Sequence, residues 1–346
     1  MAKISCVDLF CGAGGLTHGF VLEGLPVVAG IDMDPACRFP YETNNQARFI
    51  ERDISTVTKE ELSSLFGDAD VKVLAGCAPC QPFSNYANRY SLEGDGKWGL
   101  LYEFARLAEA TNPDIITMEN VPTVAKHAVF HDFVDTLKRL NYHVWHGVIN
   151  SSLYGVPQAR RRMVLLASKL GEINFIPPTH DKPRTVREAI GKLPALKAGE
   201  SAPLDKLHVS SSLTEKNLQR IRVSIPGGTW RDWPKHLVAN CHRESSGQTY
   251  PSVYGRMDWD KPAPTMTTQC FGFGNGRFGH PEQDRAISLR EAAILQSFPP
   301  NYTFLPEGGE VHLKVLGRLI GNAVPVDLGR AIAKCIKSHL SLVEIG

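Results

Sequence analysis

Two cysteines stand three residues apart in the stretch GCAPCQPFS, which runs from Gly76 to Ser84. A pair with this spacing suits three kinds of chemistry: a redox couple, half of a metal site, or one nucleophilic thiol beside an idle one. Zinc would need a second close ligand pair, and Cys77 and Cys80 are the one close pair among the eight cysteines. We therefore expect no metal, and the choice between the other two chemistries depends on what surrounds the pair.

A glycine-rich turn offers a second candidate site. The stretch DLFCGAGGL follows an apolar run and places Gly12, Gly14 and Gly15 where a doubly wound fold brings its backbone close to a cofactor. The third glycine of the dinucleotide fingerprint is missing, which weakens a pyrophosphate interpretation. Asp32 stands 20 residues past Gly12, where a carboxylate can bind both ribose hydroxyls, and Asp53 could reach an adenine amino group. The pattern fits a nucleoside without pyrophosphate, such as S-adenosylmethionine, at least as well as NAD, and a turn with a purely structural role stays open.

The elements that must position these residues alternate between short β-branched runs and amphipathic stretches. We predict strands at 4–10, 26–32, 71–77, 114–120, 143–150 and 163–168. The stretches between them, at 16–24, 34–45, 100–111 and 129–140, predict helices. Such alternation predicts an α/β fold with a parallel sheet and helices on both faces.

The pattern changes after about residue 170, where Pro, Gly and Trp residues are frequent and amphipathic stretches are few. This change predicts a second, irregular domain over residues 171–285. Helical periodicity returns at SLREAAILQSF, where Ser288 and Glu291 match a capping box, and at VDLGRAIAKCIKSHLSLV near the C-terminus. We expect this last helix to return to the first domain, which would then comprise residues 1–170 and 286–346.

The composition of the 346-residue chain is ordinary for a soluble globular protein, with 42% apolar and 21% charged residues. No apolar run is long enough to span a membrane, and the N-terminus shows no secretion leader, so a cytoplasmic protein is expected. The cysteines are too sparse for a disulfide scaffold, so most should be reduced and buried. The net charge is +2, yet residues 163–285 hold 17 Lys/Arg against 12 Asp/Glu, which suits a polyanion partner and equally an ordinary solvated surface.

Seven short motifs follow one another along the chain: DLFCGAGG, IDMD, GCAPCQPFS, MENV, QARRR, LREAAILQSFP and GNAVP. In this order and spacing the chain resembles the DNA (cytosine-5)-methyltransferases over nearly its whole length, in particular those of prokaryotes and phages. The resemblance implies a Rossmann-like class I methyltransferase domain that uses S-adenosylmethionine without metal, and a smaller target-recognition domain at 171–285. It also implies that the CAPC pair holds one nucleophilic thiol beside an idle one, rather than a redox couple.

The resemblance assigns roles to four residues of the catalytic site. Carbon 5 of cytosine is too poor a nucleophile to take a methyl group until a thiolate attacks carbon 6, and Cys80 matches the family's nucleophile. Glu119 of MENV matches the acid that protonates N3, Arg162 of QARRR would hold the O2 of the base, and Arg160 would support the site and a nearby phosphate. Cys77 is then expected to be a buried bystander.

By the same resemblance, a cofactor is expected to contact the residues Phe10, Gly12, Ala13, Gly14, Gly15, Asp32, Met33, Asp53, Ile54, Pro79, Leu101, Asn322 and Val324. DNA is expected to contact the residues Gln81, Ser84, Arg89, Lys97, Gln158, Arg231, Arg243, Arg256, Thr267 and Gln269. The segment 84–99 resembles the family's mobile catalytic loop, which closes over a nucleotide swung out of the duplex.

These features predict an enzyme that methylates carbon 5 of cytosine within a short double-stranded DNA sequence. We expect a monomer that serves a restriction-modification system, with an endonuclease that acts separately, or an orphan methyltransferase. The tRNA-methylating branch of the family is one alternative, and the broad recognition segment argues against it. A non-enzymatic DNA-binding homologue is a second, against which the intact catalytic motifs argue, and a nicotinamide-dependent dehydrogenase is a third.

Overall fold

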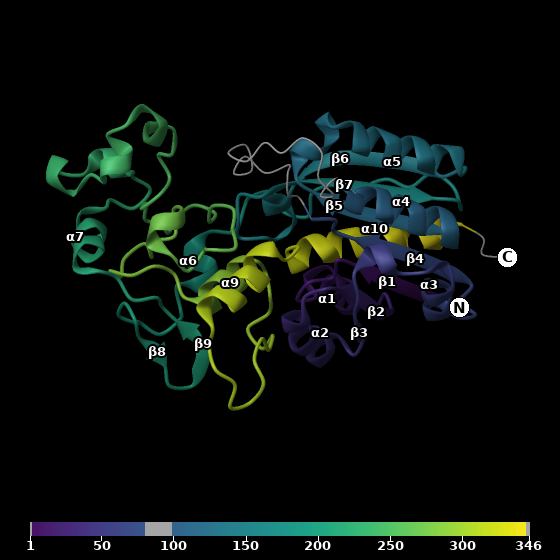
Figure 1. The fold of residues 1–346 in the computed structure, drawn as a ribbon, viewed down its shortest axis with the longest axis horizontal. Helices are drawn as coiled ribbons and strands as arrows, with labels where there is room; N and C mark the ends of the chain where they lie inside the picture. Colours follow the sequence, from purple (N-terminus) through teal and green to yellow (C-terminus); the bar gives the residue numbers. More distant parts are fainter. Residues whose placement is uncertain (1, 80–98, 344–346) are drawn as a thin grey trace. The chain divides into compact units, whose positions relative to one another are not determined.

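The computed structural model describes residues 2–79 and 99–343, which form two compact units. Within the described residues, the first unit draws on 1–154, 161–179 and 324–346, and the second on 155–160 and 180–323. Both units are therefore discontinuous in sequence, and the colours of Figure 1 show the C-terminal segment returning to the elements of the N-terminal part.

A seven-stranded sheet forms the centre of the first unit, with the strand order β3-β2-β1-β4-β5-β7-β6. Its parallel strands are β1 (Ile4–Leu9), β2 (Val27–Asp32), β3 (Arg48–Glu51), β4 (Val71–Gly76) and β5 (Ile115–Asn120). Beyond β5, β7 (Arg161–Ser168) lies antiparallel to β5 and to β6 (His143–Asn150). All six predicted strands are present, and β3 is a strand that the sequence pattern did not indicate.

The antiparallel position of β7 corrects the prediction of a parallel sheet. The connection from β6 to β7, residues 151–160, contains the 3-10 turn η5 (Ser151–Tyr154) and no crossover helix. A parallel connection needs a crossover of about a dozen residues or more, usually a helix, so this short link returns the chain antiparallel. As a result, the start of β7 lies beside the end of β5.

Helices cover both faces of the sheet (Figure 1). One face carries α3 (Lys59–Phe66), α4 (Gly99–Thr111) and α5 (Ala128–Arg139). On the other face, α1 (Gly15–Leu22) packs against α10 (Val326–Leu342), with α2 (Arg38–Asn45) beside α1. The predicted helices are confirmed, whereas α3 was not predicted although Thr58 and Glu61 form a capping box at its start. The 3-10 turns of this unit besides η5 are η1 (Pro35–Cys37), η2 (Ile54–Thr56) and η4 (Pro122–Lys126).

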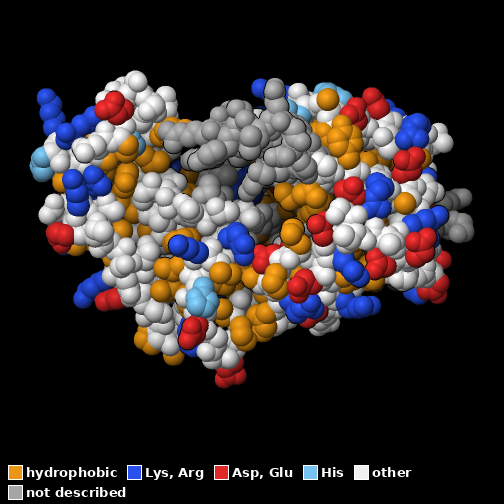
Figure 2. Space-filling view, viewed as in Figure 1, with side chains coloured by type: hydrophobic (Ala, Val, Ile, Leu, Met, Phe, Trp, Pro, Cys, Tyr) orange, Lys and Arg blue, Asp and Glu red, His pale blue; other side chains and the backbone are white. Residues whose placement is uncertain are grey.

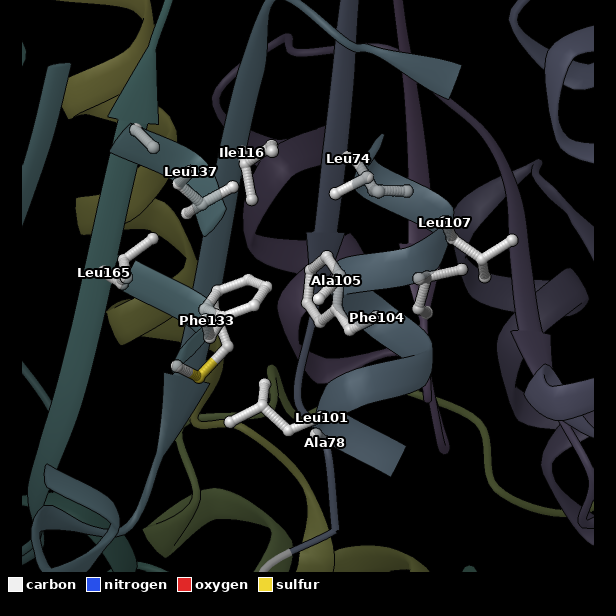
Figure 3. Close-up of a cluster of buried hydrophobic side chains, with 14 of the residues drawn as sticks. Leu74, Ala78, Leu101, Phe104, Ala105, Leu107, Ile116, Phe133, Leu137 and Leu165 are labelled. Atoms are coloured by element: carbon white, nitrogen blue, oxygen red, sulfur yellow. The ribbon is translucent and has the colours of Figure 1, made fainter. Parts of the chain in front are cut away.

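The apolar core of the first unit lies between the sheet and the helices α4 and α5 (Figure 3). Helix residues of this core meet strand residues, and the set includes Leu101, Phe104, Leu107, Phe133 and Leu137 of the helices and Leu74, Ile116 and Leu165 of the strands. Burying each side chain of this kind stabilises the fold by about 1.5–3 kcal/mol. This layer holds the carboxyl ends of β4 and β5 in a fixed position.

Two glycines allow α1 and α10 to touch through their backbones. A Cβ added at Gly19 would lie 2.6 Å from backbone atoms of three α10 residues, and one added at Gly329 would lie 2.9 Å from the carbonyl oxygen of Leu16. A larger residue at either position would therefore push the two helices apart. This contact holds the C-terminal helix within the first unit.

The second unit has little regular structure, which agrees with the irregular character predicted for this part of the chain. Its helices are α6 (Val186–Ile190), α7 (Glu215–Val223), α8 (Leu289–Leu295) and α9 (Leu313–Asn322), and its strands are β8 (Ser201–Ala202) and β9 (Asp205–Val209). Its 3-10 turns are η6 (Trp230–Asp232), η7 (Lys235–Leu237), η8 (Asn240–His242), η9 (Ser245–Thr249) and η10 (Phe273–Asn275). A small apolar cluster around Trp230, Trp233 and Phe273 forms a core.

The division into units differs from the predicted domain boundary at residue 286, because α8 and α9 belong to the second unit. The predicted capping box at Ser288 is present. However, α8 is tied to β9, since Arg290 forms an ion pair of 2.6 Å with Asp205 and Ser288 Oγ lies 2.8 Å from His208 Nδ1. Periodicity predicted a helix here but not the surface on which the helix packs.

Candidate active site

Three chain segments meet at one edge of the sheet, where β4 and β5 end and β7 begins. β4 pairs in parallel with β5, and β5 pairs antiparallel with β7, with Glu119 opposite Val164. This register brings Cys77, Glu119 and Arg162 to the same edge. The antiparallel direction of β7 is the reason that its first residues, rather than its last, lie here.

Glu119 contacts both of the other residues at this edge and is only 2% exposed. The Nε of Arg162 lies 2.8 Å from Glu119 Oε1, and the thiol of Cys77 donates a hydrogen bond of 2.8 Å to Glu119 Oε2. The contact with Arg162 is an ion pair without hydrogen-bond geometry, so Oε1 receives no hydrogen bond from residues 2–79 or 99–343. Oε1 therefore keeps the capacity to bond to a ligand.

Arg162 is the second residue of β7, and its side chain is 11% exposed. Its Nη1 donates a hydrogen bond of 2.8 Å to the carbonyl oxygen of Arg161, which together with the Glu119 ion pair orients the guanidinium. A guanidinium presents five donors in a rigid fork, whereas a carboxyl can accept or, when protonated, donate. Side by side, the two groups can hold a planar ligand that carries both donors and acceptors on one edge.

Asn120 also contributes to this edge, although the motif MENV directed attention to Glu119 alone. Its Nδ2 donates a hydrogen bond of 3.1 Å to the carbonyl oxygen of Ala78, and its Oδ1 accepts one of 2.8 Å from the Val121 N–H. These bonds hold the backbone just before Pro79. The signal in the sequence was an amide side chain directly after the acid, at the end of a buried strand.

The predicted nucleophile Cys80 lies outside the described residues, as do Gln81, Ser84, Arg89 and Lys97. Their predicted roles stay predictions. Pro79, which directly precedes Cys80, is described and is exposed.

The structure corrects the expectation that Cys77 is buried. Its side chain is partly exposed, and its thiol contacts the buried carboxyl of Glu119. Most other described cysteines are buried as expected, namely Cys6, Cys11, Cys37, Cys270 and Cys335, whereas Cys241 is exposed. Cys77 is thus set apart from the other thiols by its position beside a candidate catalytic acid.

The glycine-rich turn has the backbone conformations that glycine tolerates best. Gly12 and Gly14 have φ angles of +52° and +87°, and Phe10 has a φ of +57°. A Cβ added at Gly12 would meet no atom within 4 Å, so this backbone faces open space. α1 begins directly after Gly14, and no side chain caps its N-terminus.

Asp32, at the end of β2, is bonded to this turn. The Gly12 N–H donates to Asp32 Oδ2 at 2.9 Å, and the Asp34 N–H donates to Oδ1 at 2.9 Å. Burial raises the pKa of Asp32, while the two N–H donors oppose this rise. The predicted partners Gly12 and Asp32 therefore meet, and each carboxyl oxygen keeps a lone pair for a further bond.

The other predicted cofactor residues differ in exposure. Met33 is 68% exposed and Asp53 is exposed, with Asp53 Oδ1 accepting hydrogen bonds from the N–H and hydroxyl of Ser55. Ile54 and Leu101 are buried and belong to the apolar core of the first unit. Val324 lies in the first unit, whereas Asn322 lies in the second.

Asp8 is a buried carboxyl beneath the glycine-rich turn that sequence reasoning missed. Thr17 Oγ1 donates a hydrogen bond of 2.7 Å to its Oδ2 and lies 3.0 Å from the hydroxyl of Tyr41. Its Oδ1 is buried and has no hydrogen-bond partner within the part of the chain that the structure describes. Burial, with a smaller contribution from the charge of Asp32, raises the pKa of Asp8 to about 7.

Two residues predicted to contact DNA are buried inside the second unit. Gln158 is 0% exposed, and its Nε2 donates to the carbonyl oxygen of Leu295 at 3.0 Å and to Gln296 Oε1 at 2.9 Å. Arg256 is 5% exposed and donates to three backbone carbonyl oxygens. Both polar groups therefore bond within the protein and are not exposed in this structure, which does not favour the predicted contacts with DNA.

Arg160 is likewise buried in the second unit, where it is 4% exposed. Its guanidinium donates to the carbonyl oxygens of Met266 at 3.2 Å and Ala323 at 3.4 Å. Burial contradicts the predicted contact with a phosphate. The bond to Met266 instead fixes the backbone directly before Thr267.

The remaining predicted DNA contacts are accessible. Arg231, Arg243 and Gln269 are exposed, and Thr267 is partly exposed. Arg231 and Arg243 each donate one hydrogen bond to a backbone carbonyl and otherwise face outward. Figure 2 shows Lys and Arg side chains gathered over the part of the second unit around α7 and the turns that follow it.

Two further properties limit the kinds of site. No group of three or more His, Cys, Asp or Glu side chains within residues 2–79 and 99–343 has a geometry that could hold a metal ion. None of the helices in the described parts of the chain combines the length and apolar character needed to cross a membrane.

Comparison with known proteins decides between the chemistries that this edge allows. A family model described as C-5 cytosine-specific DNA methylase matches residues 4–338. The chain belongs to this family. Its activity is therefore the methylation of cytosine at carbon 5 in DNA, and Glu119 and Arg162 lie within the motifs on which the resemblance rested.

The chain resembles its relatives over nearly their whole length. The Type II methylase M.HgiDII of Herpetosiphon aurantiacus is 56% identical, with 96% of this chain and 95% of that protein covered. The Type II methyltransferase M1.HphI of Haemophilus parahaemolyticus is 32% identical, with 96% and 87% covered. A solved structure described as a DNA modification methyltransferase of an Escherichia coli prophage has a TM-score of 0.73 at 21% identity, with 98% of this chain and 100% of that chain covered. These findings confirm the Rossmann-like methyltransferase fold and favour DNA over the tRNA alternative.

Proposed function

We propose that the enzyme uses S-adenosylmethionine to methylate one cytosine within a specific double-stranded DNA sequence, through a transient covalent bond between Cys80 and the base. The observation that carries this proposal is the buried carboxyl of Glu119, held 2.8 Å from the Arg162 guanidinium at the strand edge that leads into Cys80. The family supports the reaction, and the geometry supports the assignment of these side chains to it.

The chemistry begins with the Cys80 thiolate, which adds to carbon 6 of the cytosine. The electrons of the 5,6 double bond then make carbon 5 nucleophilic, while N3 takes a proton from Glu119. Bound S-adenosylmethionine would supply an electrophilic methyl group to carbon 5 and remain as S-adenosylhomocysteine. A base then removes the proton from carbon 5, the bond between carbon 6 and the Cys80 sulfur breaks, N3 returns its proton to Glu119, and the thiolate is regenerated.

Arg162 would hold the cytosine in position for these steps by binding its O2 atom. A guanidinium suits the O2 of cytosine because it is always charged and its donors are fixed in a plane. Its position beside Glu119 allows the acid and the O2 donor to bind neighbouring atoms on one edge of the ring. Reaching these groups requires the nucleotide to leave the base stack, which costs a few kcal/mol.

The glycine-rich turn and Asp32 fit the nucleoside part of S-adenosylmethionine. The backbone of Gly12 faces open space, and Asp32 is oriented by two N–H donors with lone pairs left for ribose hydroxyls. The exposed Met33, adjacent to Asp32, offers an apolar side chain against the adenine ring. Asp53 is the candidate for the adenine amino group.

The second unit would supply sequence recognition. Its exposed Arg231 and Arg243 can contact phosphates or guanine, and Thr267 and Gln269 lie on a loop suited to base edges. The Type II designation of the similar proteins supports service in a restriction-modification system. We further propose that the chain acts as a monomer and that any companion endonuclease acts separately.

The decisive experiment expresses the chain in a host without cytosine-5 methylation, followed by bisulfite sequencing of the host DNA. We expect methylation of one short sequence and none with Cys80→Ala or Glu119→Gln. A duplex with 5-fluorocytosine in that sequence should form a stable adduct that mass spectrometry maps to Cys80. An adduct at another residue, or methyl transfer to tRNA in place of duplex DNA, would overturn the proposal.

A further inference from the structure

The first cysteine of the CAPC pair has no part in the reaction described above, yet its thiol lies on the candidate catalytic acid. The Sγ of Cys77 donates to Glu119 Oε2 at 2.8 Å. Within the described residues this is the one hydrogen bond that the carboxyl of Glu119 accepts, because Oε1 receives none. The contact joins the residue after β4 to the neighbouring strand β5.

Orientation of the carboxyl plane is the property that this bond controls. The terminal torsion of a glutamate side chain has a broad energy well, so an unanchored carboxyl rotates over a wide range. The Arg162 Nε lies 2.8 Å from Oε1 and attracts that oxygen electrostatically, but without hydrogen-bond geometry it defines no direction. The bond from Cys77 therefore fixes the position of Oε2, and Oε1 then faces Arg162 and can still bond to a ligand.

A thiol is chemically suited to this position. A thiol offers one weak donor, which can orient one oxygen of the carboxyl without placing a further charge beside it. The sulfur is also only partly exposed, which limits competition from water.

From these contacts we infer that Cys77 is a positioning residue for the reaction, whose thiol orients Glu119 toward N3 of the flipped cytosine. The inference rests on the proposed role of Glu119. Cys77 touches neither substrate nor cofactor in this arrangement, and it acts through the acid. The CAPC pair is then a nucleophile and the orienting group of its acid, rather than a nucleophile and an idle thiol.

The test measures the single-turnover rate of methyl transfer to a saturating duplex substrate with Cys77→Ala and Cys77→Ser. Loss of the donor in Cys77→Ala should slow the chemical step about tenfold, as expected for one hydrogen bond to a charged group. Cys77→Ser keeps a donor and should recover most of the rate. The Kd for DNA should be unchanged in both variants, because the effect lies on the chemical step.

Two comparisons separate this role from general damage. Cys335→Ala removes a thiol that donates to the carbonyl oxygen of Ala331 within α10, and it should leave the rate unchanged. In a Glu119→Ala background, Cys77→Ala should cause no further slowing, since no carboxyl remains to be oriented. If Cys77→Ala does not fold by circular dichroism, Cys77→Gly is the second variant without a donor.

The outcomes are distinct. A wild-type rate for Cys77→Ala, or equal slowing by Ala and Ser, would show that the donor has no role and would overturn the inference. Additional slowing in the Glu119→Ala background would overturn it as well, because Cys77 would then act elsewhere. A full rate for Glu119→Ala alone would instead refute the proposed acid, independently of Cys77.

Discussion

The two units of this methyltransferase satisfy their buried polar groups in different ways. In the first unit, sheet ladders and helices pair most of the backbone, and the core between the sheet and α4 and α5 is apolar. In the second unit, where regular elements are short, buried arginines donate to backbone carbonyl oxygens such as those of Met266 and Leu237. Because a buried carbonyl without a donor is costly, an irregular fold needs such side chains.

The arginines of the second unit show what this difference means for function. Arg160, Arg220 and Arg256 are each at most 7% exposed, and each donates to at least one backbone carbonyl oxygen. An arginine carries five N–H donors on one side chain, so it can satisfy several carbonyls at once. The excess of basic residues in this part of the chain is therefore partly structural, and only the exposed members are available to DNA.

Buried carboxyl groups of the two units also differ in whether a charged side chain lies beside them. Glu291 of the second unit is 1% exposed and accepts two hydrogen bonds of 2.7 Å from Arg285. Burial alone would raise the pKa of Glu291, but the bonds from Arg285 hold it below the ordinary value. Asp8 of the first unit is bonded by Thr17 and has no cationic partner among the described residues, and burial raises its pKa to about 7. One carboxyl is compensated by a charge, and the other is not.

The largest effect is expected from breaking the compensated pair. Arg285→Ala should destabilise the protein by about 3–5 kcal/mol, because it leaves the buried charge of Glu291 without a partner. The measurement is urea unfolding monitored by tryptophan fluorescence. The matched control is Arg187→Ala, which removes an exposed ion pair with Asp260 and should cost at most about 1 kcal/mol. Equal losses for the two variants would show that burial of an ion pair does not decide how much its loss destabilises the protein.

A smaller and pH-dependent effect is expected from Asp8→Asn. The folded state holds a proton on Asp8 up to a pKa of about 7, whereas an unperturbed aspartate loses it near 3.8, so the stability of the wild type falls as pH rises between these values. The substitution removes this fall. Above pH 7 the variant should gain at most about 4 kcal/mol over the wild type, with little difference at pH 4. Thermal unfolding at pH 5 and pH 8 tests this, and a difference independent of pH would contradict it.

The smallest effect is expected from the comparison of a buried and an exposed arginine. Arg256→Ala removes the donor to the carbonyl oxygen of His280 and a second donor from those of Ile221 and Gln283, and it should cost about 1–3 kcal/mol of stability. Arg243→Ala should leave stability unchanged and weaken DNA binding, with a reduced dependence of affinity on salt. Calorimetric unfolding and a salt series of DNA affinities measure the two quantities. Loss of stability in Arg243→Ala would show that exposure is a poor guide to function here.

The strands of the first unit were predictable because each is a short apolar run between turn residues. β3, with only Arg48–Glu51, and α3 were missed because short, half-exposed elements carry little periodicity. The antiparallel direction of β7 was also missed, since strand direction depends on the connection and not on the composition of the strand. That direction brings Arg162 to the edge that holds Glu119.

The site was predictable where a motif matched the family and poorly predictable where only a residue type was available. Glu119 and Arg162 were expected to act together, and the ion pair between them joins them. Arg256 was expected at the DNA as a basic residue of the recognition segment, and it is buried. The bonds of Asn120 to Ala78 and of Cys77 to Glu119 were not predicted, because each joins residues 42 positions apart in the sequence.

The sequence by itself determined the family, the reaction, and the order of strands and helices along the chain, because these follow from motifs and from local periodicity. The tertiary structure decided which polar side chains are exposed and which thiol contacts the carboxyl of Glu119. These depend on contacts between residues far apart in the sequence, such as Cys77 with Glu119, Glu119 with Arg162 and Arg160 with Met266. Burial and hydrogen bonding are properties of the packed surroundings, and a residue type alone does not carry them.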